Sequence, residues 1–276
     1  MQQVELPQSD NEWQEIEYEE LGLKIFASLN TPSEKIKENI VTNLKRDLPQ
    51  VWPHKEQDTV VALVAGGPSL VDTLDELKEV QANGGKVVAL ANTVKTLLDH
   101  GIKPSAQVLL DAKPNNENFI HDVEGCTYFV ASQCDPAVFD KLEGQRVLIW
   151  HAMNSTEEFE IIHEYTDQWV PIQGGSTIAL RAIRLLQIMG YSNFEIFGLD
   201  SCFLDGKHHA YDQPNADNQE SVQIKLNDHI FTVSAWMVQQ SMDFMTMVKA
   251  FGQDWNLKVH GPGLIATMIR EGGKGE

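Results

Sequence analysis

Two glycine-rich segments of this sequence could bind a phosphate group. Gly66-Gly67-Pro68-Ser69 follows an apolar run, and Gly174-Gly175-Ser176-Thr177 lies later in the chain. Glycine has no Cβ, so a ligand can approach its backbone closely, and free N–H groups at a helix start attract anions. Pro68 suits a first helical turn, and the Ser69 hydroxyl could donate to a phosphate. We therefore expect both segments to contact a nucleotide.

Both segments also fit ordinary helix starts. Ser69-Leu70-Val71-Asp72 matches a capping box, and capping alone is about as well supported as phosphate binding there. The second segment has more glycines and hydroxyls than capping requires, which slightly favours ligand contact. Neither a Walker loop nor a dinucleotide fingerprint is predicted, because GxxxxGK[ST] is absent and the GxGxxG spacing is not met.

Aspartates at the ends of apolar runs could hold a cation. Asp111 ends the run 108–110, and Asp200 ends the run 194–199. The carboxyl ends of parallel strands form the ligand crevice, so Asp111 and Asp200 could bind Mg²⁺, with Asp200 close to the reacting groups. A turn or cap role is equally supported for both, and is favoured for Asp205, which precedes Gly206. Asn92, at the end of the run 86–92, is a further nucleotide-binding candidate.

A histidine pair could transfer a proton. His208 or His209 could act as general acid or base, or bind a phosphate when charged, and the Tyr211 hydroxyl could assist. Adjacent residues in extended backbone point apart, so we expect at most one imidazole to face the site. A solvated loop is the alternative, and the two interpretations are evenly supported.

Two further groups of side chains favour structural roles. Arg181 and Arg184 could clamp an anion, but a solvated helix face is favoured. A broad apolar stripe favours core packing or a contact between subunits. That stripe comprises Trp236, Met237, Met242, Phe244, Met245, Met247 and Phe251.

An alternation of strands and helices must position these residues. Apolar runs predict strands over 59–65, 86–92, 105–111, 127–132, 146–151 and 193–199. Amphipathic segments predict helices over 69–82, 93–100, 136–142, 155–165 and 176–189. Strands this apolar fit a sheet buried on both faces. The predicted fold is therefore α/β, a Rossmann-like, mostly parallel sheet with helices on both faces.

The two ends of the chain differ from this alternation. Alternating residues predict a hairpin over 222–226 and 229–233, then a helix over 235–251 and a short strand near 257–260. We expect 261–263 to close the ordered part and 271–276 to fray. Residues 1–57 read as an acidic N-terminal arm with a helix ending at Leu44, which could pack on the main domain or support association. The main domain is placed at 58–276.

Composition limits the partners. The 276 residues are 42% hydrophobic and carry a net charge of −19, from 40 acidic and 21 basic residues. A surface with this much negative charge repels nucleic acid and anionic lipid. Neither is therefore expected as a partner. No signal peptide or membrane-spanning run is present, which predicts a cytoplasmic protein. The expected partners are a nucleotide and a small-molecule acceptor, with homo-oligomer formation left open.

The motifs together resemble a known family. The segments 65–70, 102–104, 109–111, 174–176, 198–200 and 205–210 are similar, in this order, to those of the 6-hydroxymethylpterin diphosphokinase MptE-like domain family. That family includes the flagellar motility accessory factors. The first segment is also similar to the loop of bacterial CMP-dependent sialyltransferases. The resemblance implies a Rossmann-like transferase domain with Gly66, Gly67, Ser69, Gly175 and Ser176 at the donor.

The resemblance implies two reactions. One moves diphosphate from ATP to the hydroxymethyl group of a dihydropterin with Mg²⁺, and the other moves a nonulosonic sugar from a CMP donor to a protein hydroxyl. Asp111 and Asp200 would lie at the reacting phosphates. We expect a nucleotide-dependent transferase of the MptE-like type. The alternatives are a dedicated CMP-sugar glycosyltransferase, a non-catalytic nucleotide-binding module, and an assembly protein whose acidic arm binds a basic partner.

Overall fold

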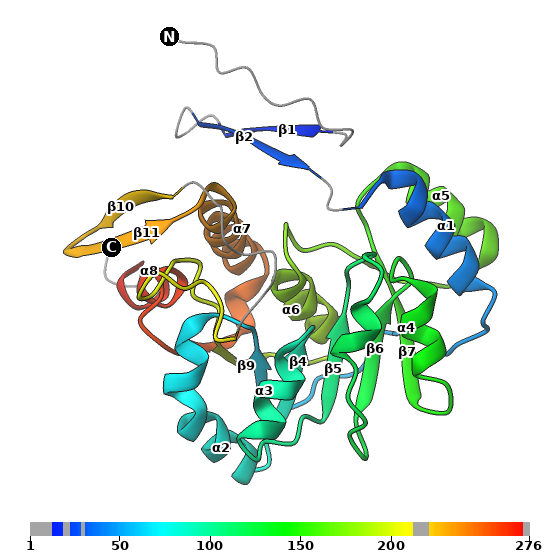
Figure 1. Ribbon diagram of the computed structural model, residues 1–276, viewed down its shortest axis with the longest axis horizontal. Coiled ribbons are helices and arrows are strands. Elements are labelled where there is room, and N and C mark those ends of the chain that lie inside the picture. Colours follow the sequence, from blue (N-terminus) through cyan, green and yellow to red (C-terminus); the bar gives the residue numbers. More distant parts are fainter. Residues whose placement is uncertain (1–12, 19–22, 29–30, 212–220, 273–276) are drawn as a thin grey trace.

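The centre of the molecule is an eight-stranded sheet in which every neighbouring pair of strands is parallel (Figure 1). The computed structural model describes residues 13–18, 23–28, 31–211 and 221–272. The order across the sheet is β12-β9-β3-β4-β5-β6-β7-β8. The strands are β3 (Val61–Val64), β4 (Lys86–Leu90), β5 (Ala106–Leu109), β6 (Thr127–Ala131), β7 (Arg146–Ala152), β8 (Pro171–Ile172), β9 (Asn193–Phe197) and β12 (Asn256–Val259).

Helices connect the strands and cover both faces of the sheet (Figure 1). They are α1 (Ser33–Leu44), α2 (Leu74–Ala82), α3 (Thr93–Asp99), α4 (Pro136–Lys141), α5 (Thr156–Tyr165), α6 (Ile178–Ile188), α7 (Ala235–Phe251) and α8 (Leu264–Gly272). Short 3₁₀ turns add Pro68–Thr73, Asn116–Phe119 and Gly252–Asp254. All four residues of β3 and of β5 are buried, as expected for strands covered on both faces.

The order of the strands places a crevice beside β3. From β3 to β8 each new strand is added on one side, whereas β9 pairs with the other side of β3, and β12 continues beyond it. In open α/β sheets, ligands bind outside the carboxyl ends of the strands where the order reverses. The segments after β3 and β9 meet at this point, which brings Gly66 and Gly67 close to Gly198 and Asp200.

The sequence-based fold is confirmed, with local corrections. The expected parallel strands, the hairpin β10 (Val222–Leu226) and β11 (His229–Val233), and the helix α7 are all present. The helix expected over 69–82 begins instead as the 3₁₀ turn Pro68–Thr73, in which the Thr73 hydroxyl donates to the carbonyls of Ser69 and Leu70. The chain also continues past 261–263 as α8, because Leu264, Ile265 and Ala266 pack into the core. Residues 273–276 lie outside the described part.

Part of the N-terminal segment packs on the sheet domain. Helix α1 contacts α4 and α5. Its Asn39 amide donates to the Gln133 carbonyl at 3.0 Å, and its Asn43 amide donates to the carbonyls of Ser132 and Cys134 at 2.9 and 2.8 Å. Another element, missed in the sequence, is the antiparallel pair β1 (Trp13–Tyr18) and β2 (Leu23–Ser28). The boundary expected at 57/58 stays a prediction.

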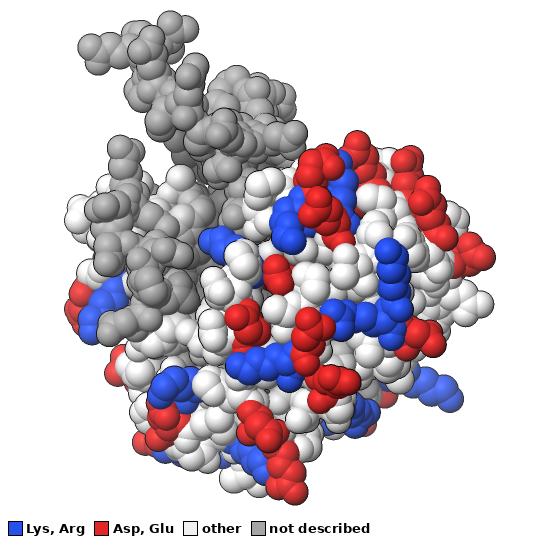
Figure 2. All heavy atoms as spheres, turned by 45° about the vertical axis from the view of Figure 1, so that its right-hand side comes forward, with Lys and Arg blue, Asp and Glu red and all other residues white. Residues whose placement is uncertain are grey.

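Charge is dispersed over the side of the molecule seen in Figure 2, where acidic and basic side chains are interspersed. Among the described residues, no helix combines the length and the apolar character needed to cross a bilayer. The three cysteines, Cys126, Cys134 and Cys202, are buried and unpaired, as their odd number and spacing predict.

Candidate active site

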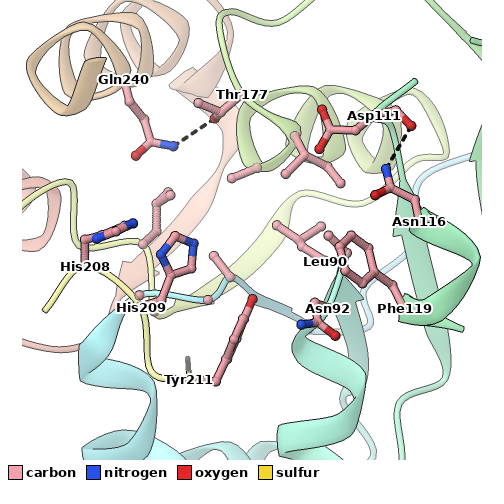
Figure 3. Close-up of a pocket in the computed structure, with 18 of the residues that line it drawn as sticks. Leu90, Asn92, Asp111, Asn116, Phe119, Thr177, His208, His209, Tyr211 and Gln240 are labelled. Atoms are coloured by element: carbon pink, nitrogen blue, oxygen red, sulfur yellow. Dashed lines mark hydrogen bonds between the residues drawn. The ribbon is translucent and has the colours of Figure 1, made fainter. Parts of the chain in front are cut away.

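A cavity of about 700 Å³ opens at the carboxyl ends of β3, β4, β5 and β9 (Figure 3). Helices α6 and α7 close it from the side. Its lining consists of 65–67, 90–92, 111, 113–116, 118–119, 177–179, 198–201, 208–209, 211, 236–237 and 240. Of the expected site residues, the cavity brings together Gly66, Gly67, Asn92, Asp111, Thr177, Asp200, His208 and His209.

The first glycine segment is held by its own backbone. The Gly67 N–H donates to the Gly198 carbonyl at 2.7 Å, so the pairing of β3 with β9 continues into the loop. A Cβ at Gly67 would overlap the Gly198 carbonyl oxygen and a carboxylate oxygen of Asp200. The Leu70 N–H donates back to the Gly67 carbonyl, and Pro68 has no N–H. Glycine at 67 therefore permits close backbone packing, and its amide is not free to bind a phosphate.

Asp200 also packs against the loop after β3, at Gly67 and Ser69. Its Oδ2 accepts the Ser69 N–H at 2.9 Å, and its carbonyl accepts the Leu264 N–H at 2.8 Å. Its side chain is buried, and burial raises its pKa above the ordinary value, an effect that the hydrogen bond from Ser69 opposes. The capping box expected at Ser69 does not form, because the Ser69 hydroxyl is buried against Gly261 without a hydrogen bond in the described part of the chain. Pro68 and Ser69 do not line the cavity.

Both histidines face the cavity, which corrects the expectation that only one would. The chain bends at 208–211 instead of extending, so neighbouring side chains are not forced apart. The two rings lie edge to face with their centroids 4.4 Å apart. Burial, reinforced by the neighbouring imidazole of His208, lowers the pKa of His209 to about 4. His209 is therefore neutral near pH 7, and its Nδ1 is buried without a hydrogen bond among the described residues.

Tyr211 covers the first glycine of the loop. The Ala210 N–H donates to the Gly66 carbonyl at 2.9 Å, which fastens the histidine segment to the loop after β3. A Cβ on Gly66 would meet the phenol of Tyr211. Gly66 thus makes room for an aromatic side chain at the cavity wall, on the same side as the histidines (Figure 3).

The opposite end of the cavity carries amide side chains. We call it the amide end and define it by Asn92, Asp111, Asn116 and Phe119, which lie together in Figure 3. The Asn116 side chain donates to the Asp111 carbonyl at 3.1 Å, which holds the loop after β5 in place. Amides both donate and accept hydrogen bonds, so this end suits a polar ligand group.

The second glycine segment is only partly in the cavity. Thr177 lines it, and its hydroxyl accepts from the Gln240 amide at 2.8 Å (Figure 3). Gly174, Gly175 and Ser176 are not among the lining residues, and the Ser176 N–H donates to Asp243 Oδ2 at 3.1 Å. The two glycine segments thus approach one cavity, yet Ser176 and Thr177 serve mainly to join α6 to α7.

The metal-ligand role expected for Asp111 and Asp200 stays a prediction. One carboxylate oxygen of Asp200 is used by the Ser69 N–H, and Asp111 lies at the amide end beside Asn116. Within the described residues, no group of three or more His, Cys, Asp or Glu side chains is arranged to hold a metal ion. A role for Mg²⁺ stays a prediction, and no chemical step is derived from it.

The backbone of the cavity wall adopts an unusual conformation at three positions. Non-glycine residues seldom adopt positive φ, and such positions cluster at active sites. Ala91, Asn115 and Ser201 have φ of 45°, 70° and 50°, and all three line the cavity. Nothing in the sequence pattern indicated these positions, since none is glycine.

Several lining residues were missed or given other roles. Phe119, Lys113 and Gln240 carried no motif, and Trp236 was assigned to an apolar stripe. Of that stripe, Met237, Phe244 and Met247 are core residues as expected. Arg181 is neither an anion clamp nor solvated, because its guanidinium is largely buried and donates to Asn154 Oδ1 and the Met153 carbonyl.

Comparisons with known proteins agree with this architecture. The model of the 6-hydroxymethylpterin diphosphokinase MptE-like family matches residues 34–206, which is more than half of the chain. The chain belongs to this family. The matched region contains β3 through β9 and ends at residue 206, before His208 and His209, so it includes most of the cavity walls of this MptE-like protein but not its histidine pair.

The MptE-like fold recurs in a solved glycosyltransferase. The structure of the MAf glycosyltransferase from Magnetospirillum magneticum AMB-1 is similar, with a TM-score of 0.66, 16% sequence identity and coverage of 83% of this chain. This chain spans 36% of that protein's length. A mammalian sialyltransferase in complex with Gal-beta-1-3GalNAc-ortho-nitrophenol has a TM-score of 0.41 at 9% identity over 83% of this chain and 86% of its own, which is too low to support an inference. No curated protein matches the chain in sequence.

Proposed function

We propose that this MptE-like protein is a nucleotide-dependent transferase that moves a sugar from a nucleotide-linked donor to a hydroxyl acceptor. The observation that carries the proposal is the cavity itself. Its volume of about 700 Å³ lies within the usual range for small-molecule sites, and it occupies the switch point of the sheet. Family membership and the fold shared with the MAf glycosyltransferase support the same class.

The charge of the lining favours a sugar nucleotide over diphosphoryl transfer from ATP. Lys113 is the one lysine or arginine among the described lining residues. The amides of Gly67 and Ser69 are already paired within the protein. Phosphoryl transfer depends on neutralising several negative oxygens with cations and amides. A donor with a single phosphate, such as a CMP-sugar, places fewer charges in this cavity.

The end of the cavity that carries His208 and His209 supplies a group that can accept the proton of the acceptor hydroxyl. In the transfer step, the acceptor oxygen bonds to the anomeric carbon of the sugar as the bond from that carbon to the phosphate oxygen breaks. The hydroxyl proton passes to an imidazole, and the nucleotide leaves with the bonding electrons. His209 is neutral near pH 7 and can take this proton. Tyr211 and Trp236 flank the same end and would orient the acceptor.

Binding and turnover separate this proposal from its rivals. Isothermal titration calorimetry with CMP, CTP and ATP, each with and without Mg²⁺, identifies the donor nucleotide. We expect CMP to bind without Mg²⁺ and more tightly than CTP or ATP, because it carries fewer charges. We also expect CMP-sugar to be consumed by the wild type and by His163→Asn, a histidine on α5 outside the cavity. His209→Asn should bind CMP as the wild type does but lose turnover.

Other outcomes replace the proposal. Binding of ATP alone, dependent on Mg²⁺, would indicate diphosphoryl transfer. Binding without release of sugar to any hydroxyl acceptor would indicate a nucleotide-binding module. Failure to bind any of these nucleotides would remove the transferase interpretation.

A further inference from the structure

A buried glutamine beneath the cavity connects the two loops that form its amide end. Gln107 lies in the middle of β5, between β4 and β6, and its side chain is fully buried. Its Nε2 donates to the Ala91 carbonyl at 2.7 Å and to the Phe119 carbonyl at 2.9 Å. Ala91 belongs to the loop after β4 and Phe119 to the loop after β5. One amide group therefore fixes the separation of both loops.

Each loop carries side chains of the cavity lining. Ala91 precedes Asn92, and the 3₁₀ turn Asn116–Phe119 presents Asn116 and the Phe119 ring. Ala91 is held twice by β5, since its N–H donates to the Val108 carbonyl at 3.0 Å and its carbonyl accepts from Gln107. Movement of the Gln107 amide would therefore shift Asn92 on one loop and Asn116 and Phe119 on the other.

Stability alone does not explain a glutamine at this position. Its Oε1 is buried without a hydrogen bond among the described residues, and a buried acceptor that is left unpaired lowers the stability of the fold. The residue it holds, Ala91, has a φ of 45°, a conformation that non-glycine residues rarely adopt. An apolar side chain would fill a central strand of a parallel sheet without this unpaired oxygen.

We propose that Gln107 is a positioning residue that sets the shape of the amide end and thereby the affinity for the polar part of the donor. It acts through the Ala91 and Phe119 carbonyls and does not itself line the cavity. The inference rests on the proposed function for the identity of the ligand, a nucleotide-linked donor. The role in holding the loops depends only on the structure.

Two measurements test the proposal with the full chain. Gln107→Met keeps the length of the side chain and removes both N–H donors. Gln81→Met is the matched control, because Gln81 also donates to a backbone carbonyl, that of Lys103 at 2.6 Å, away from the cavity. Amide hydrogen exchange should rise at 91–94 and 116–120 in Gln107→Met and stay at the wild-type level there in Gln81→Met. Gln107→Asn, which shortens the amide by one methylene, provides a second version if the Met variant does not fold.

Calorimetry with CMP, UMP, AMP and GMP provides the ligand measurement. We expect Gln107→Met to bind the nucleotide that the wild type prefers about tenfold more weakly, and Gln81→Met to bind it as the wild type does. Asn116→Ala should weaken binding less in the Gln107→Met background than in the wild type, because the loop has already moved. A merely structural role for Gln107 would make the two effects additive.

The outcomes distinguish the two proposals. Wild-type exchange rates at both loops in Gln107→Met, or wild-type affinity in that variant, would overturn the positioning role while leaving the transferase proposal intact. If the wild type binds none of the four nucleotides, the transferase proposal fails. The exchange rates at the two loops then decide the positioning role by themselves.

Discussion

Asp200→Asn separates a structural carboxylate from a metal ligand at the centre of the site. The Asp200 side chain is buried, and its Oδ2 accepts the Ser69 N–H at 2.9 Å. Asparagine keeps an acceptor oxygen in the same position, so the loop after β3 should retain its conformation. Alanine removes the acceptor and leaves a buried N–H unpaired, which costs about 1–3 kcal/mol. For a chain of this size, that loss lowers Tm by about 2–4 °C per kcal/mol.

The raised pKa of Asp200 determines whether the stability of the folded protein rises or falls with pH. Burial raises the pKa of Asp200 in the folded state above its ordinary value of 3.8. The folded protein therefore binds the proton more tightly than the unfolded chain, and stability falls as pH rises between these two pKa values. Asparagine does not titrate, so this decline should be smaller in Asp200→Asn. Relative to the wild type, the variant should gain stability from pH 4 to pH 7.

Thermal unfolding in buffers from pH 3.5 to 7.5 measures this difference. Asp205→Asn is the control, since Asp205 is exposed at a turn with a φ of 50°, a conformation that asparagine tolerates. The reasoning is refuted if Asp200→Asn is destabilised more at pH 7 than at pH 4, which would require a carboxylate that is stabilised in its charged form. A metal-ligand role would also appear as a loss of Mg²⁺ binding in Asp200→Asn that Asp205→Asn does not share.

Three further predictions follow from packing and protonation in the site and core. Gly67→Ala should destabilise the fold by about 1–3 kcal/mol by overpacking against the Gly198 carbonyl and the carboxylate of Asp200. In chemical denaturation Gly84→Asn should destabilise it less, because that site has open space and its cost is confined to the positive φ, which asparagine adopts more readily than most residues. The kcat/KM of the wild type for transfer should rise as pH rises through about 4, where His209 loses its proton; a kcat/KM that is flat or falls across this pH would contradict the assignment. Burial lowers the pKa of His151 to about 4, so the stability of the folded protein should decrease as pH falls from 6.5 to 4. Circular dichroism melts of His151→Gln should show a smaller decrease, and an equal decrease would show that another group titrates.

The architecture was predictable because its signals are local. Apolar runs such as 61–64 and 106–109 bury both faces of a parallel strand, and glycines such as Gly101 and Gly190 end the helices before them. The hairpin turn at Asn227-Asp228 and the length of α7 follow from the same kind of pattern. Helix α8 was missed because the glycines at 261 and 263 indicate a chain end, although they serve to pack against Ser69 and Asp200.

The sequence by itself determined an α/β sheet and placed Gly66, Asp111 and Asp200 after its strands, and strand ends in a parallel sheet share one edge. Tertiary structure alone decided what these residues do there. Whether an N–H faces a ligand depends on whether another part of the chain has already accepted it, and Gly198 and Asp200 accept those of Gly67 and Ser69. Hydrogen-bond partners more than a hundred positions apart leave no periodic trace in a sequence, because they follow from how the strands are ordered and not from any local spacing.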